Sequence, residues 1–396
     1  MKKSISVRVV LVIMVTAATA LYFATEFTWG QGVFSRGDGI MTFIPTGTAI
    51  EFDSHSRAQF YAPGGRGFFF ATRDGIGFIS DDGRIQMAES ISMQNPILLG
   101  EGQTVGVFEP RGLQAYIFNN RGLMYSLSFK NPIVTFAINA RGYSATVTRR
   151  GDEYETFVYN PSGGRVIRWV ASNVIVVSAA ISPDGRILAL GSLDLSGIQL
   201  NSILTFFYLN PREAAPYTNN IFASIRGESV PELNNQIFGI IRFMDGNNLV
   251  VVTERTVFAV SESQPSRPAW IIPLDNYLDA VYLRGSHVAL AKGRGILNMQ
   301  PEPMGRVVLL DLNGERIWKY DTGERVHSLA MNPHGTVIGR NRHFTAVDHR
   351  GQLLWNYETV FDSRGAIFLD STSRILLHTG TDASVMRLVR VSGMTK

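Results

Sequence analysis

After residue 37, the chain consists of short apolar runs rich in Val, Ile, Phe, Leu and Tyr, separated by clusters of Gly, Asn, Asp and Pro. Hardly any segment repeats apolar residues at helical spacing, whereas strand-length runs bounded by turn residues recur to the C-terminus. This pattern predicts an all-β domain.

The polar turns repeat at a regular spacing. A turn followed by a strand with aromatic or long apolar residues recurs every roughly 40 to 50 residues, which is the length of a four-stranded propeller blade. The copies are "ISDDGRIQM" near 83, "IFNNRGLMYSL" near 121, "VYNPSGGRVIRWV" near 163, "FYLNPREAAPYT" near 211, "AVSESQPSRPAWII" near 265, "LLDLNGERIWKY" at 309–320 and "AVDHRGQLLWNY" at 346–357. Two further strands precede each of these turns, as in "AAISPDGRILALGS" at 179–192. Each blade therefore has strands A, B, C and D, with the polar turn between C and D.

The end of the chain predicts an eighth blade that lacks its fourth strand. Residues 365–380 supply strands A and B, residues 385–391 supply strand C, and no D strand follows. An open sheet edge tends to be paired, and "TAIEFD" at 48–53 is the candidate. We therefore expect an eight-bladed β-propeller over residues 47–396, closed by N- and C-terminal strands; seven blades result if the last segments form a separate hairpin.

The two sharpest repeats share an acid, a glycine and an aromatic residue. Gly lies in the turn between strands C and D, where a positive φ is usually needed, and the acid at the start of the turn can accept hydrogen bonds from backbone N–H groups. The tryptophan lies on the outermost strand, where it can cover the neighbouring blade and donate its N–H to a turn carbonyl. These predicted structural residues are Asp311, Gly314, Trp318, Asp348, Gly351 and Trp355.

Four of the five tryptophans fall on predicted D strands, namely Trp169, Trp270, Trp318 and Trp355. That distribution favours packing between blades over the alternative, a ligand cage.

"DLNGERIW" and "DHRGQLLW" resemble the blades of quinoprotein-like (PQQ-like) repeat propellers, and "ISPDGRILALGS" at 181–192 is similar to WD40-type and lactonase-type repeats. Within the quinoprotein-like group, the chain is closest in size to the exported propeller of the outer-membrane assembly machinery, a scaffold without enzymatic activity. It departs from that protein because it has no cysteine to carry a lipid. It departs from the quinoprotein dehydrogenases in being shorter and lacking a vicinal cysteine pair, so the resemblance implies no quinone cofactor.

The N-terminus predicts export. Lys2, Lys3 and Arg8 precede an uncharged apolar stretch at 9–25, and Glu26 follows it. This charge order places the N-terminus in the cytoplasm and the rest of the chain outside it. We expect a transmembrane signal anchor at 1–27 and a linker at 28–46; a cleaved signal peptide, with "ATA" at 18–20 as its cleavage site, is the alternative.

Composition and motifs exclude several functions. The 37 basic and 33 acidic residues give a formal charge of only +4 without a basic run, so no nucleic-acid partner is expected. The absence of cysteine excludes disulfides, thiol catalysis and thiolate metal sites. No phosphate loop, dinucleotide fingerprint or nucleophile elbow occurs, and the histidines show no metal-ligand spacing. We therefore expect no catalytic residue, cofactor or metal.

The longest insertions indicate a binding face. In an antiparallel blade, the connections from B to C and from D to A emerge on one face, and the insertions at 192–202, 224–236 and 292–304 all belong to these classes. Loops on a rigid scaffold are frequent binding sites. The predicted partner-binding residues are Leu200, Arg226, Glu228, Leu233, Ile296, Leu297 and Met299. The alternative is that these loops fold back over the propeller.

These observations predict a monomeric, membrane-anchored, periplasmic propeller that acts as a protein-binding scaffold in an envelope-associated complex. The competing function is an enzyme or ligand sensor that uses the central channel. Charged groups in the channel would favour that function, and a lining of Ala, Ser and Val, as in "SAAIS" and "SLAMN", would oppose it.

Overall fold

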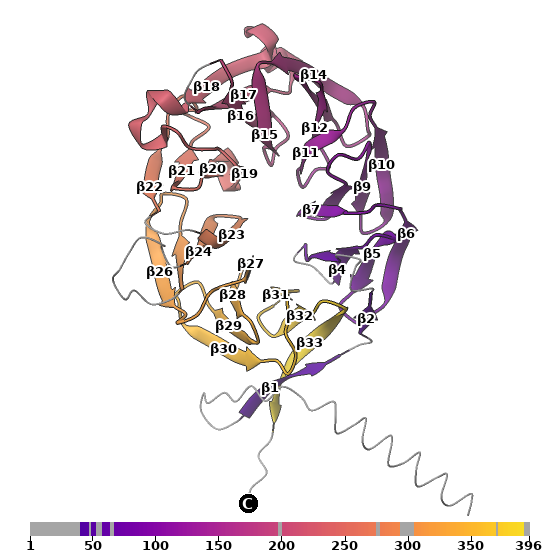
Figure 1. Cartoon of the computed structure of the whole chain (residues 1–396). Helices are drawn as coiled ribbons and strands as arrows, with labels where there is room; N and C mark the ends of the chain where they lie inside the picture. The colour runs from indigo at the N-terminus through magenta and orange to yellow at the C-terminus, as the bar shows by residue number, and fades with distance from the viewer. Residues whose placement is uncertain are drawn as a thin grey trace, which may run out of the picture.

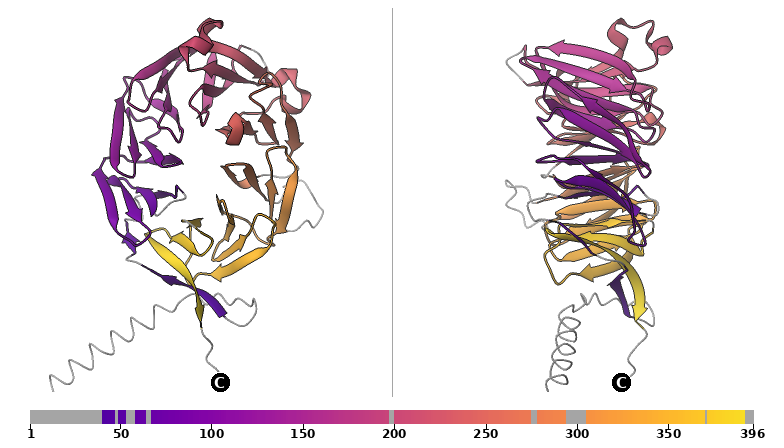
Figure 2. Two further views of the ribbon diagram at one scale, coloured as in Figure 1. Left: turned by 180° about the vertical axis from the view of Figure 1, so that it is seen from behind. Right: turned by 90° about the vertical axis from the view of Figure 1, so that its right-hand side faces the viewer.

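The repeats form eight antiparallel sheets arranged around a central opening (Figure 1). The structure is a computed structural model that describes residues 40–46, 49–52, 58–63, 67–196, 200–274, 278–293, 305–369 and 371–391. The predicted eight-bladed all-β propeller is thereby confirmed, and the seven-bladed alternative is wrong. Seen edge-on, the ring is thinner than it is wide, with connections on both faces (Figure 2).

The first four blades follow the chain from the inner to the outer strand. Blade 1 is β3 (Gln59–Tyr61), β4 (Gly67–Ala71), β5 (Gly75–Ser80) and β6 (Ile85–Ser90); blade 2 is β7 (Ile97–Glu101), β8 (Thr104–Phe108), β9 (Gln114–Asn119) and β10 (Gly122–Ser128). Blade 3 is β11 (Ile133–Ile138), β12 (Ser144–Arg150), β13 (Glu153–Tyr159) and β14 (Arg165–Ser172); blade 4 is β15 (Val174–Ile181), β16 (Ile187–Asp194), β17 (Asn201–Tyr208) and β18 (Ile221–Arg226).

The next three blades repeat this order. Blade 5 is β19 (Ile240–Phe243), β20 (Leu249–Val252), β21 (Thr256–Val260) and β22 (Trp270–Pro273). Blade 6 is β23 (Leu278–Arg284), β24 (His287–Lys292), β25 (Arg306–Leu310) and β26 (Arg316–Asp321); blade 7 is β27 (Ser328–Asn332), β28 (Gly335–Arg340), β29 (His343–Val347) and β30 (Leu353–Glu358). Short helices lie in the connections: α2 (Pro211–Ala214), η1 (Thr218–Asn220), η2 (Gly227–Ser229), η3 (Pro231–Leu233) and η4 (Asp245–Asn247).

Blade 8 joins the two ends of the described chain. It contains β31 (Gly365–Phe368), β32 (Arg374–His378) and β33 (Asp382–Val391), and its outermost strand is β1 (Ile40–Pro45), which pairs with β33 over its whole length. The short strand β2 (Ile50–Glu51) pairs with the start of β33. Closure by an N-terminal strand is therefore correct, but most of that strand lies in the predicted linker at 28–46 rather than at 48–53. The buried ring of Phe43 in β1 packs against Trp355 and Tyr357 of blade 7, with centroid distances of 4.9 and 5.2 Å.

The "DxNG" and "DxRG" turns have the predicted structure. One carboxylate oxygen of Asp311 accepts hydrogen bonds from the N–H groups of Asn313 and Glu315 at 2.9 and 2.8 Å, and Asp348 repeats the arrangement. Gly314 and Gly351 adopt φ values of +80° and +78°, which glycine reaches without steric cost. The acid and the glycine of each repeat therefore stabilise the turn itself.

The tryptophans on the D strands pack between blades. A Cβ atom added at Gly351 would lie 2.9 Å from the Trp318 side chain, so each glycine also makes room for the indole of the preceding blade. Trp270 and Trp355 donate their indole N–H to the carbonyls of Leu312 and Thr372 at 2.7 Å. The buried N–H of Trp318 has no hydrogen-bond partner within the described chain, so the predicted bond to a turn carbonyl is absent there. Structural packing rather than a ligand cage is the observed role of these residues.

The membrane anchor predicted at 1–27 lies outside the described residues. Among the residues that the structure does describe, no helix is both long and apolar enough to cross a bilayer.

Candidate functional site

The two faces of the ring carry different connections. We call the face with the B-to-C and D-to-A connections the loop face, and the face with the A-to-B and C-to-D turns the turn face. The strand order places the connection at 227–239, and the described ends of the connections at 195–200 and 293–305, on the loop face, as predicted. Of the predicted partner-binding residues, Ile296, Leu297 and Met299 lie outside the described residues.

The connection at 227–239 folds back over blade 4. Leu233 is 0% exposed and belongs to a buried cluster with Phe238. The hydroxyls of Ser178 and Ser202 donate to the carbonyls of Phe238 and Gln236, both at 2.6 Å, and fasten the connection to the blade. The prediction that Leu233 contacts a partner is therefore wrong. Leu233 is buried because these hydrogen bonds hold the connection against the blade, where its apolar side chain joins the core.

The other described candidates differ from Leu233. Leu200 is half-buried, whereas Arg226 and Glu228 are exposed. The guanidinium of Arg226 lies 3.4 Å from the carboxylate of Asp194 and 3.8 Å from that of Glu228. Hydrogen bonds from Ser196 and then the charge of Arg226 lower the pKa of Asp194. This small charged group remains accessible at the end of blade 4.

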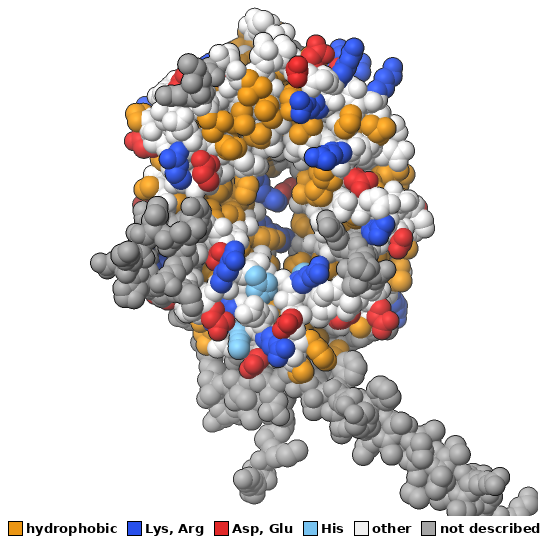
Figure 3. Space-filling view, viewed as in Figure 1, with side chains coloured by type: hydrophobic (Ala, Val, Ile, Leu, Met, Phe, Trp, Pro, Cys, Tyr) orange, Lys and Arg blue, Asp and Glu red, His pale blue; other side chains and the backbone are white. Residues whose placement is uncertain are grey.

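Large apolar side chains are exposed on the loop face, and none of them was among the predicted residues. They come from the loop-face ends of blades 2, 4 and 5 and from the connection between blades 7 and 8, and Phe361 is the most exposed of them at 69%. Figure 3, which looks onto this face, shows hydrophobic side chains gathered above the opening, over blades 4 and 5. We call the following residues the loop-face apolar set: Leu113, Leu195, Ile237, Ile240, Val360 and Phe361.

The pair Val360 and Phe361 had a signal in the sequence, because two adjacent apolar residues stand between Thr359 and Asp362 in a predicted connection. Other exposed apolar residues, such as Ile85 and Leu123, lie one per blade on outer strands, which is ordinary for a protein surface. Grouping on one face distinguishes the loop-face apolar set from these.

The inner strands enclose a central cavity of about 780 Å³. Small residues line part of it, including Ser178, Ala179, Ser328 and Ala330, as "SAAIS" and "SLAMN" predicted. Charged groups line it as well, and Figure 3 shows basic and acidic side chains deep in the opening. The cavity therefore has both the small-residue lining expected of a scaffold and the charged groups expected of an enzyme or ligand sensor.

The charged groups of the cavity meet across the ring. The guanidinium of Arg242 in blade 5 forms an ion pair with Glu101 in blade 2. Tyr61 in blade 1 donates its hydroxyl to the carbonyl of Gly102 at 3.2 Å, and burial, reinforced by the charge of Glu101, raises the pKa of Tyr61. The phenol therefore stays protonated at neutral pH. Sequence reasoning missed this group because its members are far apart in the chain.

Two of the described histidines pack against each other. His287 and His349 stack with their centroids 4.7 Å apart on the turn face, where blades 6 and 7 meet. Burial, and then the neighbouring His349, lower the pKa of His287. Across the described ranges, no group of three or more His, Asp or Glu side chains has a geometry that could hold a metal ion.

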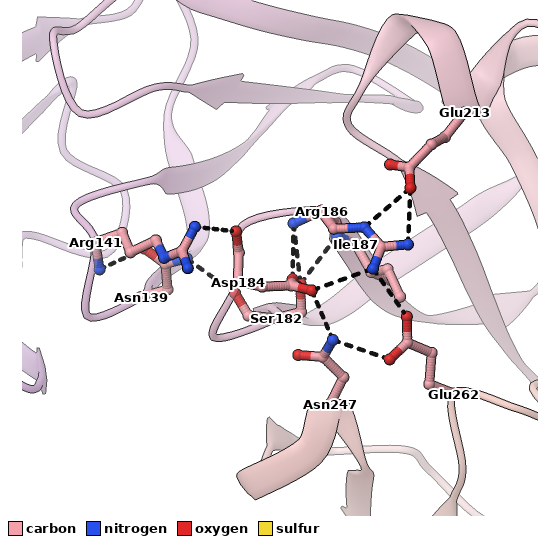
Figure 4. Close-up of polar contacts among 9 residues, drawn as sticks. All are labelled: Asn139, Arg141, Ser182, Asp184, Arg186, Ile187, Glu213, Asn247 and Glu262. Atoms are coloured by element: carbon pink, nitrogen blue, oxygen red, sulfur yellow. Dashed lines mark hydrogen bonds and ion pairs between the residues drawn. The ribbon is translucent and has the colours of Figure 1, made fainter.

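A polar network joins blades 3, 4 and 5 on the turn face (Figure 4). The carboxylate of Asp184 accepts hydrogen bonds from Ser182, from the backbone N–H of Arg186 and from Asn247, at 2.6, 3.0 and 2.7 Å. Burial alone would raise the pKa of Asp184, but these bonds outweigh it and lower the pKa. Arg186 also pairs with Glu213 at 2.7 Å. Because each partner belongs to a turn, the network holds the rim of the ring together.

The comparisons with known proteins agree with this architecture. Residues 46–388 match the profile of the family described as "Family of unknown function (DUF5711)". The chain belongs to this family. The matched region begins directly after β1 and ends within β33, so it spans blades 1 to 7 and most of blade 8. A search of curated proteins finds no match.

Solved structures show the same fold at low sequence identity. The C-terminal WD40 domain of Sif2 aligns with a TM-score of 0.60 at 11% identity, covering 87% of this chain and 98% of that one. Sqt1 from Chaetomium thermophilum aligns with a TM-score of 0.55 at 9% identity, covering 88% and 99%. BamB from Moraxella catarrhalis aligns with a TM-score of 0.52 at 12% identity, covering 88% and 100%. The resemblance to quinoprotein-like and WD40-like propellers is confirmed as a likeness of fold.

Proposed function

We propose that this chain is a membrane-anchored, extracytoplasmic propeller that acts as a protein-binding scaffold in an envelope-associated complex. The observation that carries the binding role is the loop-face apolar set, which exposes large side chains together on one face of a rigid ring. Large apolar side chains that are exposed on one face of a protein often mark a protein-protein contact. The envelope location rests on the charge order of the N-terminus and on the resemblance to an exported scaffold.

The exposed charges near this set suit the rim of such an interface. Arg226 directly precedes the connection that carries Ile237, Glu228 is part of that connection, and both side chains are exposed. Interfaces commonly have an apolar centre and a polar rim. The partner is therefore expected to present an apolar surface bordered by charged groups, and no reaction is assigned to this face.

Crosslinking from single positions in native membranes tests the binding role. A photo-reactive residue is placed at Leu195, Ile237 or Phe361 in the full chain, and at Ile85 on the outer surface as the control. We expect the same protein to be crosslinked from all three loop-face positions and not from Ile85, whose side chain is similarly exposed at 67%.

Surface variants then separate binding from folding. Ile237→Ser combined with Phe361→Ser should reduce the crosslinking yield from Leu195, whereas Ile85→Ser should leave it unchanged. Neither change should lower the melting temperature much, because each replaced side chain is at least 39% exposed. Equal crosslinking from Ile85, or an undiminished yield in the folded double variant, would contradict the proposed scaffold face.

Fractionation tests the anchor separately. The full chain should remain in the membrane pellet after alkaline extraction, and a chain beginning at residue 28 should be released. Release of the full chain would contradict anchoring while leaving the binding face untouched.

A further inference from the structure

The central cavity has a polar end and a less polar end. The inner strands all run from the loop face toward the turn face, so the last residues of each strand lie at the turn-face end of the channel. Tyr61, Glu101 and Arg284 are the last residues of β3, β7 and β23. Residues nearer the loop face include Val177 and Ile240. Seen from the loop face, the charged groups thus lie at the far end of the channel. We call this turn-face end the floor of the channel.

Arg284 forms the second link across the floor. Its guanidinium donates to the carbonyls of Met331 in blade 7 and Pro63 in blade 1, both at 3.1 Å, and makes a longer contact of 3.5 Å with the carbonyl of Ala62. These acceptors are neutral, and they use only part of the five N–H donors that a guanidinium carries. Within the part of the chain that the structure describes, no carboxylate forms an ion pair with Arg284, although the side chain is only partly exposed.

The charge balance of the floor favours an anion. The charge of Glu101 is already neutralised by Arg242, so the pair and Arg284 together leave one positive charge. Asp245 also lines the channel, but its side chain is exposed at the turn-face rim, where water screens it. A half-buried cation held only by neutral carbonyls is a site where a bound anion gains charge-assisted hydrogen bonds.

We propose that the channel binds a small organic carboxylate that enters from the loop face. Its carboxylate accepts hydrogen bonds from Arg284 at the floor, where the planar guanidinium matches the planar acid. Its apolar body lies against the half-buried side chains of Leu99, Val177 and Ile367 on the wall. A single net positive charge suits a monoanion, and the cavity is within the size range of small-molecule sites. This ligand site is independent of the proposed scaffold role.

Calorimetric titration of the full chain with matched acid and amide pairs tests the proposal. The probes are acetate, hexanoate and benzoate, each compared with its amide, at low and at high salt. We expect hexanoate or benzoate to bind at least about tenfold more tightly than its amide, which is the lower end of what a hydrogen bond to a charged group contributes. Acetate should bind more weakly because it lacks the body that contacts the wall. An acid that binds no better than its amide would overturn the proposal without requiring any variant.

Variants locate the site. Arg284→Gln should remove the preference for acid over amide, and Arg316→Gln, which changes an exposed arginine on the outer strand of the same blade, should leave the preference unchanged. Arg284 also links blades, so its replacement could affect folding as well as binding. Val177→Phe provides a second test, because it narrows the channel without altering its charge. This variant should weaken hexanoate and benzoate by about tenfold or more while affecting acetate less. A preference that survives in folded Arg284→Gln, or bulky acids that bind Val177→Phe normally, would overturn the assignment.

Discussion

Trp318 and Trp355 occupy the same place in consecutive blades and differ in one interaction. Both are buried, with exposed fractions of 6% and 2%. The indole N–H of Trp355 donates to the carbonyl of Thr372 at 2.7 Å, whereas the buried N–H of Trp318 has no partner among the described residues. Replacing each by phenylalanine therefore isolates the contribution of the N–H group.

The expected difference follows from the two states of the N–H. Both changes remove a similar apolar volume, so this cost largely cancels between them. Trp355→Phe also loses a hydrogen bond, which contributes about 1 kcal/mol, whereas Trp318→Phe removes an unpaired buried donor whose burial costs about 1 to 3 kcal/mol. Trp355→Phe should thus lower the free energy of unfolding by about 2 kcal/mol or more beyond the effect of Trp318→Phe.

Urea denaturation followed by far-UV circular dichroism measures the difference, provided that the slopes of the two variants agree. Trp270→Phe is the control, because Trp270 makes the same 2.7 Å bond, to the carbonyl of Leu312, in blade 5. It should show the same loss of a hydrogen bond as Trp355→Phe. If Trp318→Phe destabilises the protein as much as Trp355→Phe does, the reasoning about the unpaired N–H is refuted.

Three further predictions concern the ring. Gly351→Ala should lower the melting temperature more than Gly323→Ala: both residues have positive φ, which costs about 1 to 2 kcal/mol, but only at Gly351 would the added Cβ meet another side chain; equal losses would contradict the packing role. Phe43→Ala should cost about 3 to 5 kcal/mol in urea denaturation, because the ring is buried where β1 closes the propeller, and a cost below about 1 kcal/mol would show that closure depends little on it. Burial, and then the charge of Arg364, lower the pKa of His378 to about 4 from an ordinary value of 6.5, so the unfolded chain binds more protons between these values and stability should fall as the pH drops from 6.5 to 4, by up to about 3 kcal/mol. His378→Gln should flatten this pH dependence of the free energy of unfolding, and an unchanged slope would exclude His378 as its source.

The repeat and its turns were predictable because their interactions are local. An acid bonded to N–H groups two and four residues later, followed by a glycine at positive φ, is determined by neighbours in the chain, and "DLNGERIW" and "DHRGQLLW" carry all of these residues. The period of the turns then predicted the blade, and the missing last strand predicted that an N-terminal strand closes the ring. The sequence did not show which N-terminal residues close the ring. Pairing with β33 decided this, since both 40–45 and 50–51 pair with that strand.

The surfaces were decided only by the tertiary structure. Leu233 and Ile237 are both apolar residues of one connection, yet the first is fully buried and the second is exposed, because the path of the loop over blade 4 selects which side chains reach the core. Glu101 and Arg242 come from blades 2 and 5, and nothing local to either residue indicates the other. The sequence by itself determined the blade, its turns and its packing tryptophans, since these depend on contacts within or between successive repeats. Only the closed ring determines which charged side chains meet in the channel and which apolar side chains are exposed on the loop face. Both depend on how residues from distant blades are placed relative to one another.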